Sequence, residues 1–457
     1  MGRGSKFKAT AIAIATVAIG STELSAQNAN PNSPVNGNLG LTTRVVVDSN
    51  QSLNETSPGT TVTASESLSF GYTSETSLQS FNFSADAALR YSRTDGVTET
   101  SAFDNPGARL GYSRQGANSS FNFSANYRTR DVINALDAED ATVDDITVST
   151  GTLETYGARF GYDFGTDAPF GLSFSASQNF RDYNDTTDPD LVDSQNRSLG
   201  VTARLRFSPV TQGTLSVSRS NSEIENADNT EKQTTSYRFG VSHELRRGLS
   251  LNANLGYSET EKTESSVTTT TDVSSLSIGA SQDLVNGAIF GNVKFSSDDN
   301  DRVSLTFGRS MELPDGSLSA SVTAINDTGS GTKFLGNLNY SKDLPRGGFN
   351  VGLSQSLTTN NDDEDVKFSR LGVGFNQSIN SVSRINLSMN VARTQADAGS
   401  GAGEKTRGDI SASYTQELAE DWNMSVGYRH RAFSETGTSA ESDSVFLTLT
   451  KNIALGF

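Results

Sequence analysis

The chain has 457 residues, of which only 34% are hydrophobic, a low share for a row of soluble domains that must each fill a core. Its formal net charge of -17 argues against a nucleic-acid partner, because the chain offers no basic stripe to neutralise phosphates. The absence of cysteine excludes a disulfide scaffold and thiol chemistry.

The first residues have the pattern of an export signal. A basic segment (1–8) precedes an apolar segment (9–20) that is too short to span a bilayer, and a polar stretch then ends at Ala26. We therefore expect a cleaved signal peptide at 1–26 and a short polar periplasmic lead at 27–37. No later stretch reaches the ~18 consecutive apolar residues of a membrane helix. The mature chain then either dissolves outside the cytoplasm or crosses a membrane as strands.

Apolar side chains recur at every second position through much of residues 38–457, which is the period of a strand with one apolar face. Sequence segments also repeat: "FNFSA" occurs at 81–85 and 121–125, and "GARLGY" at 107–112 returns as "GARFGY" at 157–162. No amphipathic helix of comparable length is found. The pattern predicts an all-β domain of roughly 18–22 strands.

The connections between these segments alternate between short turns and longer, polar, often acidic loops. Examples of the longer kind are residues 135–150, 181–193, 296–302 and 359–367. All nine prolines are expected in the amino-terminal segment or in connections, since proline cannot donate to a strand ladder. This alternation is typical of a transmembrane, antiparallel, up-and-down β-barrel with short periplasmic turns and long acidic extracellular loops.

Aromatic residues fall at two levels along the predicted strands. One level lies beside the short turns and the other about ten residues away, as the two polar interfaces of a bilayer require. The predicted aromatic girdles consist of Tyr72, Tyr112, Tyr162, Tyr340 and Trp422 at the first level and Tyr91, Tyr127, Tyr257 and Tyr428 at the second.

The polar face of the predicted strands carries charges that would line the lumen. Their functional interpretation is an electrostatic constriction or a solute path. The alternative is an ordinary solvated barrel interior with paired charges. The candidates are Asp86, Arg90, Arg128, Arg204, Arg206, Arg238, Lys294, Arg370 and Arg429.

Catalytic, metal and cofactor sites are not expected. His243 and His430 cannot form a multi-histidine metal site alone, and no sequence pattern assembles a nucleophile, a base and an orienting group around them. The acidic segments at 296–302 and 359–365 could hold divalent cations through carboxylate oxygens. They lack the glycine turn and distal glutamate of a complete calcium loop, so solvated surface loops are the simpler interpretation.

With these features the sequence resembles bacterial outer-membrane β-barrels of the porin kind over nearly all of the mature chain. In that family, a terminal Phe preceded by apolar residues at every second position resembles the recognition signal for the barrel-assembly machinery. The resemblance assigns this role to Leu449, Ile453, Leu455 and Phe457, while Lys451 departs from the alternation. It also implies the cell outer membrane as the location, with its lipid and lipopolysaccharide as partners.

The first predicted hairpin, at 39–72, is also similar to outer-membrane β-barrels associated with exopolysaccharide systems. In those proteins an early strand leads into an Asp-x-Asn loop, here Asp48 and Asn50. Large TonB-dependent transporters have a strand number near 22, but the lead here has no room for their folded plug. A barrel that wide needs loops or a partner to occlude it, unless the barrel has fewer strands than this count.

Three classes of function are open. The first is a porin or export channel for small hydrophilic solutes or polysaccharide, suggested by the polar lumen face. The second is a structural or surface-interaction barrel whose acidic loops bridge to lipopolysaccharide through divalent cations. The third is a secreted β-repeat adhesin, which would have to pack its apolar faces inside a soluble sandwich or solenoid. None of the three is an enzyme.

Overall fold

The computed structural model describes residues 35–456 with short gaps. The residues inside that range that it does not describe are 96–99, 138–142, 144–145, 147–148, 187, 247, 298–300, 329–330, 361–364, 397–402 and 436. The expected signal peptide, residues 27–34 of the expected lead, and Phe457 lie outside the described residues. Among the described residues, no helix is long and apolar enough to cross a membrane.

The described chain forms 22 strands and one short 3-10 helix, η1. In chain order the elements are β1 (Val35–Asp48), β2 (Thr61–Glu75), β3 (Gln79–Thr94), β4 (Thr100–Gln115), β5 (Ser119–Asp131), η1 (Val132–Asp137), β6 (Thr152–Phe164), β7 (Phe170–Asn184), β8 (Ser194–Ser208), β9 (Thr211–Ile224), β10 (Thr230–Arg246), β11 (Leu249–Glu264), β12 (Val267–Leu284), β13 (Gly287–Ser297), β14 (Arg302–Leu313), β15 (Gly316–Asp327), β16 (Gly331–Leu344), β17 (Gly347–Thr359), β18 (Asp365–Ser378), β19 (Ser383–Ala396), β20 (Lys405–Ala419), β21 (Trp422–Glu435) and β22 (Thr438–Gly456).

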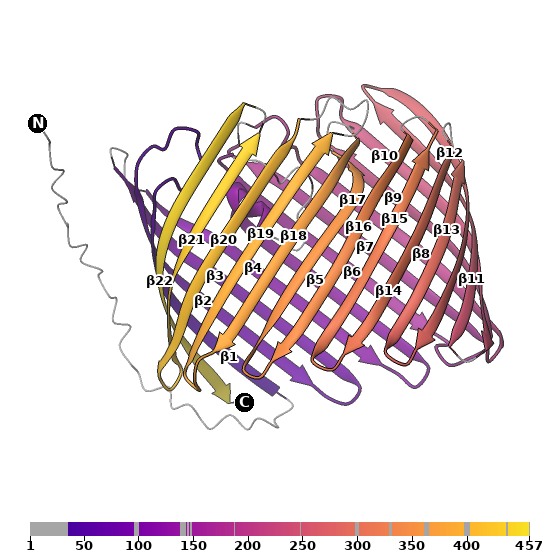
Figure 1. The fold of residues 1–457 in the computed structure, drawn as a ribbon, viewed down its shortest axis with the longest axis horizontal. Helices are drawn as coiled ribbons and strands as arrows, with labels where there is room; N and C mark the ends of the chain where they lie inside the picture. Colours follow the sequence, from indigo (N-terminus) through magenta and orange to yellow (C-terminus); the bar gives the residue numbers. More distant parts are fainter. Residues whose placement is uncertain are drawn as a thin grey trace, which may run out of the picture.

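The strands follow one another around a closed barrel in chain order (Figure 1). The last strand, β22, closes the barrel by pairing antiparallel with β1, from Asn36↔Gly456 to Asp48↔Ser444. Neither terminal strand is therefore left with an open edge in lipid. The predicted antiparallel up-and-down barrel is confirmed, at the upper end of the predicted strand number. Its first strand begins at Val35, within the segment that the sequence assigns to the lead.

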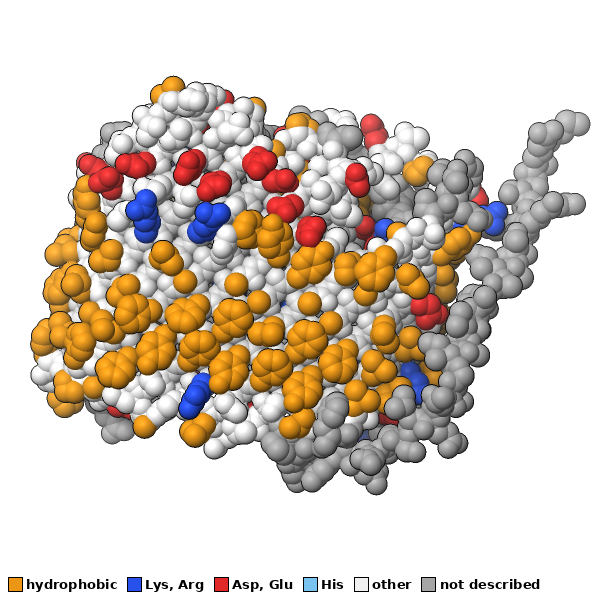
Figure 2. Space-filling view, turned by 180° about the vertical axis from the view of Figure 1, so that it is seen from behind, with side chains coloured by type: hydrophobic (Ala, Val, Ile, Leu, Met, Phe, Trp, Pro, Cys, Tyr) orange, Lys and Arg blue, Asp and Glu red, His pale blue; other side chains and the backbone are white. Residues whose placement is uncertain are grey.

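The outer face of the barrel carries the apolar residues. Leu89, Leu199, Phe307 and Phe334 are each more than half exposed, and Figure 2 shows a belt of hydrophobic side chains across one face of the molecule, with acidic side chains above it. A water-soluble barrel would place such residues inside. Because they point outward, this surface suits lipid and leaves the polar residues for the lumen.

The two ends of the barrel differ. The end at which β1 begins and β22 ends has short turns, such as 285–286 and 314–315. We call it the short-turn end, and the opposite end the long-loop end, because it carries connections such as 49–60 and 185–193. The connection between β11 and β12 at the long-loop end is nevertheless tight, with Ser265 at a left-handed φ of 45°. These two strands have 16 and 18 residues, more than the ~9–11 needed to cross a bilayer, so their hairpin projects beyond the rim.

One proline lies inside a strand, contrary to the expectation that all nine lie outside strands. Pro106 belongs to β4, where the ladder with β3 shifts between Asp86 and Ala88. Asn105, beside the proline, has a left-handed φ of 46°. The bulge leaves the proline nitrogen without a place in the ladder, which is why the residue is tolerated there.

Candidate functional site

The predicted girdle residues lie in the outward-facing set, at two levels. Near the short-turn end the rings of Tyr72 and Phe81 meet with 5.9 Å between centroids. Toward the long-loop end Tyr257 stacks with Tyr237 at 6.4 Å. By strand register the same outward set contains Tyr91, Tyr112, Tyr127, Tyr162, Tyr340, Trp422 and Tyr428.

The nine predicted lumen charges lie in the opposite set of positions, which faces inward, and several of them are paired. Arg128 Nη1 lies 3.0 Å from Asp86 Oδ1. Arg90 forms ion pairs with Asp131 and, at 3.5 Å, with Asp104. The pairs of Arg128 with Asp86 and of Arg90 with Asp131 join β3 to β5 across β4, and the pair of Arg90 with Asp104 joins β3 to β4. Such pairing suits a solvated interior with paired charges.

The remaining predicted charges differ in their surroundings. Arg204 Nη2 lies 3.6 Å from an Asp163 carboxylate oxygen, and Arg429 Nε lies 3.2 Å from one of Asp409. Arg206 donates hydrogen bonds to carbonyl oxygens of the turn before β7, and the Arg370 guanidinium lies 5.1 Å from the centre of the Phe368 ring. Within the described part of the chain, the structure gives no ion pair to the two residues Arg238 and Lys294.

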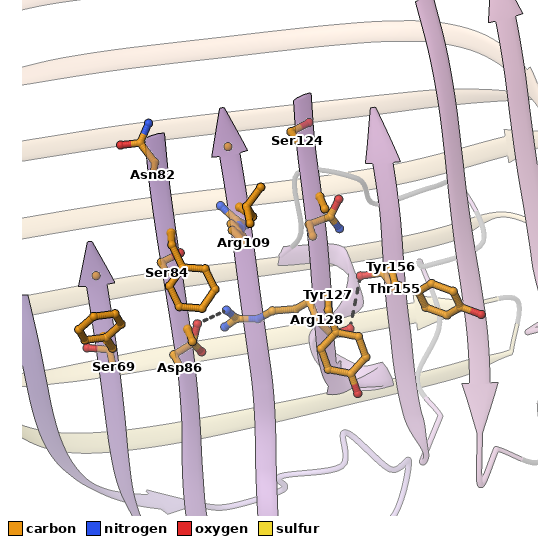
Figure 3. Close-up of a pocket in the computed structure, with 18 of the residues that line it drawn as sticks. Ser69, Asn82, Ser84, Asp86, Arg109, Ser124, Tyr127, Arg128, Thr155 and Tyr156 are labelled. Carbon is orange, nitrogen blue, oxygen red and sulfur yellow. Dashed lines mark hydrogen bonds and ion pairs between the residues drawn. The ribbon is translucent and has the colours of Figure 1, made fainter. Parts of the chain in front are cut away.

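One wall of the lumen borders a cavity of about 1510 Å³, which lies against strands β1 to β8 (Figure 3). The described residues that line it include five arginines but only one acid, Asp86. Gly107 of β4 separates that acid from Arg128, and a Cβ at Gly107 would lie 2.8 Å from Arg128 Nη1. The glycine therefore lets the ion pair cross the strand. The lining arginines are Arg109, Arg128, Arg130, Arg159 and Arg181.

Four of these arginines were missed as lumen candidates by sequence reasoning. Arg109 and Arg159 occupy the same place in the two copies of the repeat, "GARLGY" and "GARFGY". The register puts them on β4 and β6, on either side of β5. The repeat was a usable signal, because equivalent positions on alternate strands of an antiparallel barrel face the same side.

Described residues of the connection between β5 and β6 contact two sides of the lumen at the long-loop end, Val132 near β6 and Ile146 near β18 to β21. Ile146 is fully buried and packs with Ala392 of β19, Phe433 of β21 and Phe368 of β18. These strands belong to the wall opposite β5 and β6. Arg407 of β20 also donates a hydrogen bond to a carbonyl oxygen of η1. We call the described residues of this connection, 132–137, 143, 146 and 149–151, the cap.

The next long connection, between β7 and β8, reinforces the cap. Leu191 packs with Val132 and Leu153 in a small buried cluster. Ser149 and Thr186 join the two connections by a hydrogen bond of 2.9 Å between their hydroxyls. The same connection reaches β20, where Lys405 Nζ lies 3.1 Å from Asp190 Oδ2. Described residues of two long connections therefore lie against the wall at this end, which suits occlusion by loops, one of the alternatives that the sequence left open.

The Asp-x-Asn pair lies where the barrel closes, at the long-loop end of β1. Asp48 Oδ1 accepts a hydrogen bond of 2.5 Å from Ser442 Oγ and one of 2.9 Å from the backbone N–H of Asn50. The Asn50 amide donates to the carbonyl oxygen of Glu441 at 3.1 Å. The first and last strands are thus joined by side chains as well as by the ladder.

The closing strand places Leu449, Ile453 and Leu455 in the outward set, opposite Thr43, Leu39 and Gly37 of β1. Phe457, the terminal residue of the predicted assembly signal, is outside the described residues. Lys451, which breaks the apolar alternation, lies with its amine 5.4 Å from the centre of the Trp422 ring. The lysine therefore belongs to the aromatic level at the short-turn end.

The two histidines both lie on the outer face by strand register. His430 Nδ1 is 2.9 Å from Asp443 Oδ1, which also accepts a hydrogen bond from the Tyr428 hydroxyl at 2.5 Å. His243 Nδ1 is 2.8 Å from the Thr211 hydroxyl. Among the residues that the structure describes, no group of three or more His, Asp or Glu side chains has the arrangement of a metal site.

Comparison with known proteins gives a family and a fold. A family model for Gram-negative porins matches residues 9–263, more than half of the chain. The comparison with curated proteins gives no match.

Among solved structures, the barrel is similar to the FrpB iron transporter from Neisseria meningitidis, with a TM-score of 0.59, 10% identity and coverage of 91% of this chain and 82% of that chain. It is similar to the ferric-catecholate import receptor Fiu from E. coli K12, with a TM-score of 0.58, 10% identity and coverage of 93% and 82%. The copper transporter OprC gives a TM-score of 0.54, 10% identity and coverage of 91% and 80%. At these identities the likeness concerns the fold.

Proposed function

Because the chain belongs to the Gram-negative porin family, we propose that it is an outer-membrane channel for small hydrophilic solutes or polysaccharide. The observation that carries this proposal is the contrast between the two faces of the wall. Apolar side chains form the outer belt, while arginine, asparagine and serine side chains line the cavity on the inside. A polar path enclosed by a lipid-facing wall is what a hydrophilic solute needs to cross a membrane.

The cap supports a restricted channel rather than a wide open pore. A barrel of 22 strands would leave a large lumen if nothing filled it. The buried contacts of Ile146 with the opposite wall hold the cap across that lumen at the long-loop end. Solutes would pass beside the cap or after part of it moves.

The proposal includes an orientation and an assembly partner. The short turns, the start of β1 and the end of β22 would face the periplasm, and the cap would face the outside, as in bacterial barrels generally. The outward residues Leu449, Ile453 and Leu455, with Phe457, would present the closing strand to the barrel-assembly machinery. The proposal contains no catalytic step, resident metal or cofactor.

Conductance of the purified, folded protein in planar bilayers tests the channel. We expect discrete current steps in potassium chloride and no steps from protein that has been heat-unfolded. Folded protein is identified by its altered mobility in unboiled detergent gels. If such folded protein never carries current, the channel function is contradicted.

A second candidate function is surface interaction with lipopolysaccharide, and the charge of the outer face favours it. Acidic side chains occupy outward positions near the long-loop ends of β9 to β12, above the hydrophobic belt seen in Figure 2. Divalent cations could bridge these carboxylates to the phosphates of the lipid. The residues are Glu223, Glu231, Glu259, Glu261 and Asp272.

Binding to vesicles that contain lipopolysaccharide separates the second candidate from the first. We expect magnesium-dependent binding that is lost when the five acids are changed to their amides. Conductance without such binding would leave only the channel function.

The third class, a secreted adhesin, required apolar faces packed inside a soluble fold. The outward position of these faces argues against it.

A further inference from the structure

We propose that Arg109 and Arg159 form a binding point in the lumen for hydroxyl-rich solutes that carry an oxyanion, such as sugar acids and sugar phosphates. The inference rests on the proposed channel function and adds a substrate class to it. The predicted lumen charges do not include either residue, although both belong to the repeated "GAR" motif.

The two arginines are placed on one patch of the wall by the strand register. Asn126 of β5 pairs with Arg109 of β4, and Ser124 of β5 pairs with Arg159 of β6. The two arginines therefore lie on strands that flank Ser124 and Asn126 of β5. With strands about 4.8 Å apart, they are close enough for one extended solute to contact both, or to move from one to the other.

Neither arginine is engaged by an acid. The structure shows no ion pair or hydrogen bond to Arg109 or Arg159 from the described residues. Both side chains are exposed and both line the cavity. Arg128 on the intervening strand differs, because Asp86 neutralises it at 3.0 Å. The pair therefore keeps its charge and its donors available to a solute.

The charge of this wall does not follow from the charge of the chain. The protein carries a formal charge of -17, yet the described lining of the cavity contains five arginines against the single acid Asp86. A concave basic wall raises the local concentration of anions and opposes cations. Arginine in particular offers a planar fork of donors that matches carboxylate and phosphate oxygens.

Neutral amides and hydroxyls around the pair extend the recognition beyond simple ions. Ser124, Asn126 and Asn179 line the same cavity, and the described structure gives the Asn126 and Asn179 side chains no hydrogen-bond partner. Such groups can donate to and accept from the hydroxyls of a sugar. A solute with both an oxyanion and hydroxyls would use both kinds of group, whereas chloride would use only the arginines.

The test compares the double variant R109Q/R159Q with the double variant R114Q/R309Q. Arg114 and Arg309 lie in outward positions of β4 and β14 by register, so the control makes the same change in net charge on the other face of the wall. Ion preference is measured as the reversal potential in a potassium chloride gradient. Solute preference is measured as equilibrium binding of glucuronate against glucose to the purified barrel.

We expect the wild type and the control to prefer chloride and to bind glucuronate over glucose. In R109Q/R159Q the glucuronate affinity should fall by about tenfold or more, because charge-assisted hydrogen bonds are lost, and the chloride preference should fall with it. A cation-preferring wild type, or equal glucuronate binding by both double variants, would overturn the inference. If the protein conducts no ions, the channel proposal fails, and glucuronate binding alone then decides the inference.

Discussion

Asp48 of β1 and Arg431 of β21 form a buried ion pair beside the closing seam, with 2.9 Å between Asp48 Oδ2 and Arg431 Nη2 and side chains only 8% and 7% exposed. Arg431 also donates to the carbonyl oxygen of Gln51 at 3.0 Å. The contact spans β22, so it ties the penultimate strand to the first strand and to its loop. It therefore supports closure at the long-loop end of the barrel.

Replacing Asp48 with Ala should destabilise the folded barrel by about 3–5 kcal/mol, because a buried guanidinium is left without its counter-charge. The measurement is the free energy of unfolding by guanidinium chloride of the protein refolded into lipid vesicles. A matched control is Asp86→Ala, whose ion pair with Arg128 is 38% and 36% exposed and should contribute only about 0–1 kcal/mol.

The double change of Asp48 and Arg431 to leucine distinguishes the ion pair from general packing. Removing both charges should recover much of the stability lost in the single variant, since apolar pairs often replace buried ion pairs at little cost. A double variant as unstable as Asp48→Ala would show that the surrounding hydrogen bonds, rather than the missing counter-charge, set the loss.

The strands could be predicted because a barrel wall depends on local pattern. The two-residue period places Phe81 and Phe83 on one face and Asp86 on the other, wherever the neighbouring strands come from. Closure also followed, since the apolar alternation of the last strand requires a partner. Pro106 was placed wrongly because a bulge, which the period does not encode, accommodates it.

The cap could not be predicted from pattern. Ile146 lies in a polar, acidic segment with no strand or helix period, and its burial depends on Phe433, which is distant in the chain. The sequence supported only the general statement that so wide a barrel needs loops or a partner to occlude it, unless it has fewer strands. Arg109 and Arg159 could not be singled out for a different reason. They matter because the described residues give neither of them an ion pair with a carboxylate, and such pairs can be seen only when the strands are side by side.

Replacing Ile146 with Asp should release the cap from the opposite wall. The isoleucine is 0% exposed among apolar neighbours, and a carboxylate cannot be buried there without a partner. We expect larger single-channel conductance or a greater open fraction than in the wild type. The same substitution at Ile379, which is 47% exposed in a short turn, should leave conductance unchanged. Equal conductance of all three proteins would show that the cap does not limit the current.

The wall has an interruption between β16 and β17. Their ladder runs from Leu344↔Gly347 to Leu338↔Leu353 and ends there. Beyond it, side chains take over: Gln355 Oε1 accepts from the Gly336 backbone N–H at 2.9 Å, and the Asn337 amide oxygen accepts from the Gln355 backbone N–H at 3.4 Å. In this part of the wall, the contact between β16 and β17 depends on the Gln355 side chain more than on a backbone ladder.

Replacing Gln355 with Leu should therefore weaken the contact between β16 and β17 locally. Loss of the bond to Gly336 leaves a backbone donor unsatisfied at a cost of about 1–3 kcal/mol, so its amide should exchange with deuterium roughly tenfold faster or more. The control is Gln377→Leu in β18, where the backbone ladder with β17 is continuous. An unchanged rate of amide hydrogen exchange at Gly336 in the Gln355 variant would show that the hydrogen bond from Gly336 to the Gln355 side chain does not hold β16 and β17 together.

Deleting residues 455–457 should impair membrane assembly far more than deleting residues 30–34, which lie before the first strand. The first deletion removes the ladder pairs of Leu455 with Gly37 and of Gly456 with Asn36. It also removes Leu455 and Phe457, two of the four residues of the predicted assembly signal. A barrel that cannot complete its closing ladder leaves polar backbone groups exposed to lipid. The readout is the fraction of cell-envelope protein that shows the altered gel mobility of a folded barrel when unboiled. Equal yields from the two deletions would mean that the terminal residues neither close the barrel nor direct its assembly.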